Sequence, residues 1–267
     1  MAKVNITPQV KFSYNISQGS AEDRKNLASN INEQIFNSVT PNIKDDILEL
    51  SDFETALHAN LPEDKRIDIY NLEPEEEYED GASDLIEDDF GNYIGQTIEV
   101  PSENGRVSKR PIITLFHESR HVLDVLTNPK YMARVKSMYA QDLYSKNYTN
   151  LVGEFYKDLE EPTQENKVKK LKSLKKKLNK FLKDKSIEEQ VNCLQDLRYT
   201  LETERNAYAD QYKFEYRLQE RGVNTGDYEL EDESIYYFFD EKIELVKQTL
   251  SEVITQERER HKLSLEV

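Results

Sequence analysis

The spacing of apolar residues predicts a chain that is mostly helical. In the second half, apolar positions recur every three to four residues over 187–221 and 232–261, and each stretch predicts one long helix. With only 8 glycines and 8 prolines among 267 residues, the loops are expected to be short. A further helix is expected over 166–186, where one face carries an apolar stripe made of Val168, Leu171, Leu174, Leu178, Phe181 and Leu182.

The first half predicts a mixture of helices and strands. Helical spacing covers 20–39 and 42–61, whereas 65–73 alternates in the manner of a short strand. The stretches 92–100 and 105–116 suggest a hairpin that leads directly into another helix. We therefore expect an α+β fold that is mainly α-helical, with a short N-terminal β-sheet and a long C-terminal helical bundle.

The length fits one domain made of three parts. The part from about 1 to 130 is expected to hold the strands, and a helical, lysine-rich hairpin insert follows over about 131–185. The remaining part, about 186–267, is expected to be helical. The chain shows no internal repeat.

Acidic residues are concentrated between 73 and 89, where ten of seventeen positions are Asp or Glu. The block lacks the alternating ligands and the glycine of an EF-hand loop. We expect an exposed acidic loop.

The helix expected at 166–186 has the opposite charge. Ten lysines occupy its polar faces against one acid, Asp184. Such a helix could bind an acidic partner or an anionic membrane surface. The favoured interpretation is the solvated half of a helical hairpin, with the acidic block of this chain as one candidate partner.

The overall charge and composition exclude several classes of protein. A net charge of −16 argues against nucleic-acid binding, because phosphates would repel the chain. The single cysteine, Cys193, allows no internal disulfide, and no apolar run is long enough to span a membrane. Residues 1–20 form a polar arm or edge strand without the apolar core of a secretory signal. We expect a cytoplasmic protein, or one exported into a host-cell cytosol without a cleavable signal.

The most specific motif is H-E-x-x-H, within the apolar stretch 112–126. Two of the four histidines of the chain, His117 and His121, are one helical turn apart and can direct two imidazoles at one point. A tetrahedral zinc ion requires this chelating pair. Glu118 lies about 100° further round the helix, where it can reach a water on the metal but cannot join the chelate.

A catalytic zinc ion needs a third protein ligand, and Glu204 is the best candidate. The metzincin arrangement is absent, because Asp124 and Thr127 stand where its Gly and His would be. His58 and His261 are weaker candidates.

The residues around Glu204 support this choice. Glu204 shares a helical face with Ala207, Tyr208 and Gln211, and the small Ala207 would allow close approach to the His helix. Other acids of the same helix, Glu202 and Asp210, fall on other faces.

The H-E-x-x-H helix followed by the segment 204–209, of the pattern E-x-x-A-[YF]-A, resembles the gluzincin zinc metalloproteases. The small bacterial effector proteases of the NleD type and the lethal-factor-like toxins are similar in plan. The resemblance implies a zincin-like core, Zn²⁺ as cofactor and Glu118 as general base. It also implies a virulence-type endopeptidase that is secreted into a host cell and cuts a signalling or cytoskeletal protein there.

Two residue roles and the substrate-binding site stay open at this point. Asp124 could fix the orientation of His121 by accepting its second N–H, or it could be a surface acid on the last turn. The oxyanion donor is expected among the tyrosines near the later helices, with Tyr208 and Tyr212 as candidates beside Tyr199, Tyr236 and Tyr237. An open edge of the strand at 93–100 is a candidate site for an extended substrate peptide.

Two alternatives to a host-directed protease remain. The chain could be a non-catalytic helical interaction protein whose H-E-x-x-H is incidental or holds a structural metal. It could also be a regulatory protease that cuts a protein of its own cell.

Overall fold

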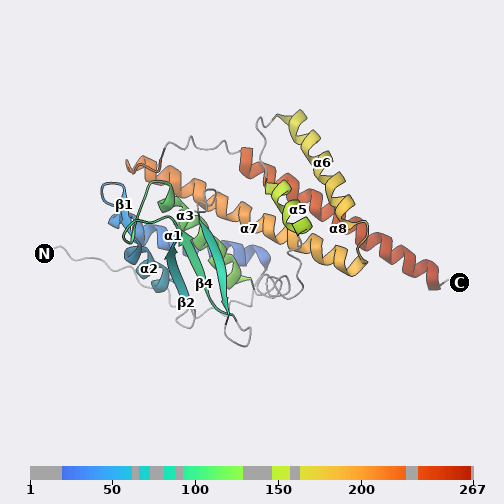
Figure 1. Cartoon of the computed structure of the whole chain (residues 1–267), viewed down its shortest axis with the longest axis horizontal. Helices are drawn as coiled ribbons and strands as arrows, with labels where there is room; N and C mark the ends of the chain where they lie inside the picture. The colour runs from blue at the N-terminus through green and yellow to red at the C-terminus, as the bar shows by residue number, and fades with distance from the viewer. Residues whose placement is uncertain are drawn as a thin grey trace.

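The computed structural model describes residues 20–61, 66–72, 81–87, 93–128, 146–156, 163–226 and 234–265. It is an α+β fold that is mainly helical, as the apolar spacing predicted (Figure 1). The expected N-terminal arm, most of the acidic block and residues 131–145 of the expected helical insert lie outside these residues. None of the described helices is both long and apolar enough to cross a membrane.

The N-terminal half contains three α-helices and five short strands among the described residues. They are α1 (Ala21–Val39), β1 (Ile47–Glu49), α2 (Leu50–Ala59), β2 (Arg66–Asn71), β3 (Ala82–Glu87), β4 (Tyr93–Val100), β5 (Arg106–Ser108) and α3 (Arg110–Thr127). A short 3-10 helix, η1 (Thr40–Asn42), follows α1. Helix α1 begins at a capping box formed by Ser20 and Asp23.

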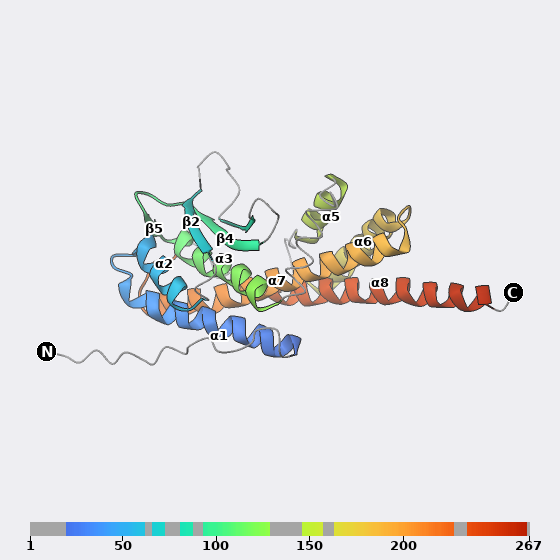
Figure 2. The ribbon, with the colours of Figure 1, turned by 90° about the horizontal axis from the view of Figure 1, so that it is seen from below.

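The C-terminal half is helical wherever it is described, apart from short connections. It consists of α5 (Lys146–Tyr156), α6 (Gln164–Leu182), α7 (Ile187–Glu220) and α8 (Ser234–Leu265). The two long helices α7 and α8 pack along each other, and α5 and α6 lie together on one side of the pair (Figures 1 and 2). The predicted helices over 166–186, 187–221 and 232–261 are thereby confirmed.

Helix α3 is enclosed between a sheet and two helices. The three-stranded sheet, of order β2-β4-β3, lies on one side of α3, and α1 and α7 lie on the other (Figure 2). Strand β2 is parallel to β4 and β3 is antiparallel to it. This enclosure explains why α3 is buried along most of its length.

Three expectations about the strands were wrong. The stretches 92–100 and 105–116 do not form a hairpin, because β4 pairs with β2 and β3 while β5 pairs with β1. Both edges of β4 are therefore occupied, and it offers no open edge to a substrate. Part of the supposed acidic loop, Ala82–Glu87, is strand β3.

The helix expected over 42–61 begins only at Leu50. Asp45 and Asp46 adopt positive φ angles of 50° and 61°, and the chain turns there so that Lys44 bonds to Ile47. An L-residue with positive φ cannot continue a right-handed helix. The residues between this turn and α2, Ile47–Glu49, therefore form β1 instead.

Two apolar clusters hold the helices together, and α7 contributes to both. The first joins α1, α2, α3 and the end of α7 and includes Phe36, Phe53, Phe116 and Phe214. The second joins α5, α6 and α8 to the first half of α7 and includes Leu174, Leu178, Leu194, Leu197 and Phe239. Residues 202–211 of α7 lie between the two clusters.

The lysine-rich helix α6 buries its apolar face in the second cluster. Leu174, Leu178 and Leu182 are at most 4% exposed. Its lysines form ion pairs with acids of the neighbouring helices, since Lys175 contacts Glu252 of α8 and Lys177 contacts Glu154 of α5. The hairpin interpretation of this helix is thus the one that fits the fold.

Candidate metal centre

Helix α3 directs both histidines of the H-E-x-x-H motif at one point. His117 and His121 are one turn apart, and their Nε2 atoms are 3.2 Å from each other. The helix ends at Thr127, where the N–H of Asn128 bonds to the carbonyl of Asp124. The placement of the two imidazoles follows from local helix geometry alone.

Glu204 of α7 completes the group. One carboxylate oxygen is 3.6 Å from Nε2 of His117, and the other is 3.5 Å from Nε2 of His121. The fully buried Ala207, one turn further along α7, lets the two helices approach closely. His117, His121 and Glu204 offer one ligand atom each within 4.8 Å of one another, so this group could hold a metal ion.

The other ligand candidates among the described residues lie elsewhere. Glu202 faces the opposite way and binds Arg198 and Lys247 at 2.8 and 3.7 Å. His58 is exposed on α2 near Glu54. The side chain of His261 lies outside the described part of the chain.

The charges of the group stabilise one another in the buried site. Burial alone raises the pKa of Glu204, but the two imidazoles and the Tyr156 hydroxyl outweigh it and lower the pKa to about 2. For His117, burial lowers the pKa, yet Glu204, Glu118 and Gln211 outweigh this and raise it. Glu204 is therefore a carboxylate at every ordinary pH.

Three side chains outside the ligand group contact it. The amide oxygen of Gln211 is 2.8 Å from Nδ1 of His117, which directs the lone pair of Nε2 into the site. Tyr208 packs its ring edge-on against His117 at 4.8 Å between centroids, and it stacks on Phe239. The Tyr156 hydroxyl donates to Glu204 over 3.4 Å.

Sequence reasoning missed the contacts of Gln211 and Tyr156 with the ligands, and the role of Tyr208 as an oxyanion donor stays a prediction. Gln211 stands on the same helical face as Glu204, and that position was the available signal. Tyr156 belongs to α5, which is brought to the site by long-range packing. The role of Tyr212, which follows Gln211 on α7, stays a prediction.

Asp124 is buried rather than exposed on the last turn of α3. Its two oxygens accept hydrogen bonds from Arg120 at 3.0 Å and Asn206 at 3.3 Å. It lies within electrostatic reach of His121, but its hydrogen bonds join α3 to α7 instead. The alternative of a surface acid was wrong.

Arg120 forms the centre of a buried polar network behind the histidines. It is 1% exposed and donates to Asp124 and, over 2.8 Å, to Asp210 of α7. Asp210 also accepts from Ser29 and Asn32 of α1. The network therefore fixes α1, α3 and α7 relative to one another.

Glu118 lies beside the ligand group without belonging to it. It is 7% exposed, and its charge contributes to the raised pKa of His117. Gly81, just before β3, approaches it closely: a Cβ placed on Gly81 would be 2.4 Å from Thr114 Cγ2 and 3.4 Å from Glu118 Cγ. Only a glycine allows this contact. Among the described strands, β3 pairs only with β4, so no described strand occupies its other edge.

Comparisons with profiles of protein families, with curated proteins and with solved structures find no match.

Proposed function

We propose that this protein is a zinc-dependent endopeptidase, with His117, His121 and Glu204 as ligands and Glu118 as general base. The observation that carries the proposal is the convergence of three ligand atoms from two helices beside a second carboxylate, Glu118, which is not part of the ligand group. In line with the resemblance of its motifs, we propose a cytosolic host protein as substrate.

The donor set and its spacing favour zinc. Two donors that each lie about 2.0–2.1 Å from a tetrahedral zinc ion are about 3.3 Å apart. The Nε2 atoms of the two histidines are 3.2 Å apart, close to this value. One Glu204 oxygen is 3.6 Å from His117 and the other is 3.5 Å from His121, so the carboxylate is near both imidazoles. Two imidazoles with one carboxylate suit zinc better than calcium or magnesium, which prefer oxygen ligands.

The number of ligands favours catalysis over a structural role. Structural zinc sites have four protein ligands, whereas catalytic sites have three and leave one position for water. Among the described residues, the group contains three. This also distinguishes the proposed function from that of a helical interaction protein with a structural metal.

The residues around the site have complementary roles in peptide hydrolysis. Zinc held by His117, His121 and Glu204 would lower the pKa of a coordinated water and polarise the scissile carbonyl. Glu118 accepts a proton from the attacking water and passes it to the leaving amine. Gln211 and Tyr156 orient His117 and Glu204 through their hydrogen bonds. An extended peptide can add to the edge of β3 that no described strand occupies, and Gly81, just before β3, lies close to Glu118.

The purified protein is expected to bind one zinc ion. Substituting a ligand should weaken zinc binding more than substituting a residue that only hydrogen-bonds to a ligand. Gln211→Ala should lower the affinity by roughly 10–100-fold, the usual effect of losing a ligand's hydrogen-bond partner. His121→Ala removes a ligand and should lower the zinc affinity further. Competition titration with a chromophoric chelator measures the zinc affinity of both variants. His58→Ala, which changes an exposed histidine of α2, is the control and should bind zinc normally.

Zinc affinity is expected to rise with pH. The raised pKa of His117 means that more of its imidazole is protonated at a given pH, and a metal ion must displace that proton. Affinity should therefore fall by about tenfold per pH unit once the pH drops below the pKa of His117, which lies above the ordinary histidine value of about 6.5. Glu204, with a pKa of about 2, contributes nothing to this change. Titrations above and below the pKa of His117 test it, and an affinity independent of pH would contradict it.

The proposed activity is tested by mapping new protein N-termini after incubation of a host-cell extract with the zinc-loaded protein. Cleavage that disappears on chelation and returns with zinc supports the proposal. A parallel bacterial extract distinguishes a host-directed protease from one that cuts a protein of its own cell. No metal-dependent cleavage in either extract would overturn the proposal.

A further inference from the structure

Helix α6 carries a straight row of exposed lysines on the face opposite its buried leucines. The row, here called the lysine stripe, consists of Lys169, Lys172, Lys176, Lys180 and Lys183, all of which are exposed. At 100° per residue these positions fall within an arc of about 80°. At 1.5 Å per residue the stripe is about 21 Å long.

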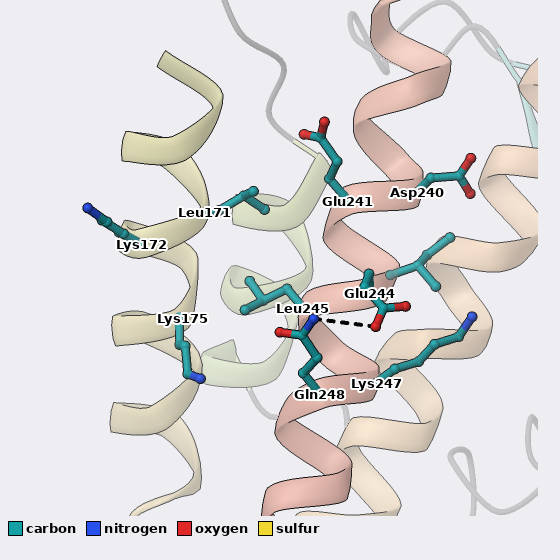
Figure 3. Close-up of a pocket in the computed structure, with 10 residues that line it drawn as sticks. Leu171, Lys172, Lys175, Asp240, Glu241, Glu244, Leu245, Lys247 and Gln248 are labelled. Carbon is teal, nitrogen blue, oxygen red and sulfur yellow. Dashed lines mark hydrogen bonds between the residues drawn. The ribbon is translucent and has the colours of Figure 1, made fainter. Parts of the chain in front are cut away.

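The lysine stripe differs from the lysines that hold α6 in the fold. Lys167, Lys175 and Lys177 pair with acids of α8 or α5. In the stripe, Lys169 pairs only with the exposed Glu165 of its own helix. The structure gives the other four no ion pair within the described residues. Lys172 and Lys175 both line the groove between α6 and α8, and Figure 3 shows the side chain of Lys172 pointing away from α8.

We propose that the lysine stripe is a docking surface for an acidic protein segment. Successive lysines of the stripe are about one helical turn, 5.4 Å, apart, which is less than the Debye length of about 8 Å at physiological ionic strength. Their charges therefore act together on one ligand. A helix with acids at the same spacing can pair with them as charged residues flanking a coiled-coil seam do.

Two observations favour an acidic protein segment over larger polyanions. The chain as a whole has a net charge of −16, which repels nucleic acid and anionic membranes that extend beyond the stripe. A membrane-binding helix also needs apolar side chains beside its lysines to enter the interface. In α6 these side chains, Leu174, Leu178 and Leu182, are buried in the second cluster. A short acidic segment contacts the stripe and little else.

The stripe is separate from the metal ligands, so this proposal is independent of the proposed protease activity. It is nevertheless connected to the site, because Lys177 on the flank of α6 pairs with Glu154 of α5, two residues before Tyr156. A segment docked on α6 is thus close to a helix that contacts the metal centre.

The test is binding of two labelled helical peptides, measured by fluorescence anisotropy. One carries glutamates at the spacing of the stripe, and the other has the same composition in scrambled order. We expect the matched peptide to bind more tightly and to be released by salt. Lys176→Glu with Lys180→Glu should weaken its binding by on the order of tenfold or more, because two attractions become repulsions.

The matched control is Lys44→Glu with Arg258→Glu, which changes the net charge equally at two exposed positions outside α6. This control should bind the matched peptide as the unsubstituted protein does, and circular dichroism verifies that both variants are folded. Absence of binding, or equal loss in the two variants, would overturn the proposal. Tighter binding of duplex DNA or of phosphatidylserine vesicles than of the matched peptide would also overturn it and assign the stripe to that ligand.

Discussion

Glu118→Gln is expected to abolish peptide hydrolysis while the protein keeps its full zinc content. The substitution preserves the size of a side chain that is 7% exposed, so the fold of α3 should be unaffected. It removes the group that accepts the proton of the attacking water, and general-base catalysis is worth roughly 10²–10⁴-fold in rate. Since Glu118 is not one of the three ligands, zinc binding should persist. Initial rates and elemental analysis of the same preparation measure the two effects.

The matched control is Glu202→Gln, which changes a carboxylate two residues from Glu204 that faces Arg198 and Lys247 instead. It should retain activity. If the Glu118 variant remains active, another group is the base. If it loses its zinc as well, Glu118 supports the metal site and its catalytic role is not demonstrated.

Arg120→Met should destabilise the metal-free protein by about 3–5 kcal/mol, the usual cost of removing one partner from a buried ion pair. The guanidinium is the charged partner of both Asp124 and Asp210, which are 6% and 4% exposed. Without it, two carboxylates remain buried with no cation in their hydrogen-bonding network. Urea unfolding in the presence of a chelator measures the change without a contribution from bound metal.

Arg106→Met provides the comparison. Arg106 forms an ion pair of 2.7 Å with Glu49, but both side chains are largely exposed. Surface pairs contribute at most about 1 kcal/mol, so this variant should be nearly as stable as the original protein. Equal stability changes in the two variants would show that Arg120 does not organise the interior in the way its contacts indicate.

The helices were largely predictable because helix formation depends on residues close in sequence. The apolar spacing over 187–221 gives α7, and the apolar stretch 112–126 lies within α3. The strands were less predictable, since pairing depends on segments far apart in the chain. Strand β4 pairs with β2, more than twenty residues earlier, and no local pattern in 93–100 reveals that partner.

The candidate site was likewise predictable only where it depends on residues close in sequence. His117 and His121 can bind one ion together because they are four residues apart in a helix. The choice of Glu204 over Glu202 followed from helix periodicity, but its arrival at the histidines depends on the packing of α7 against α3. Tyr156 could not be found from sequence, because it reaches Glu204 from a separate helix, 48 residues earlier in the chain.

By itself, the sequence determined which residues share a helical face and therefore which side chains can act as a chelating pair. The tertiary structure alone decided that Arg120 is buried with two aspartates, that Gln211 orients His117, and that β4 is paired along both edges. The physical reason is that a helix fixes its geometry over a few residues, whereas burial, ion pairing and strand order are set by contacts between segments that only the folded chain brings together.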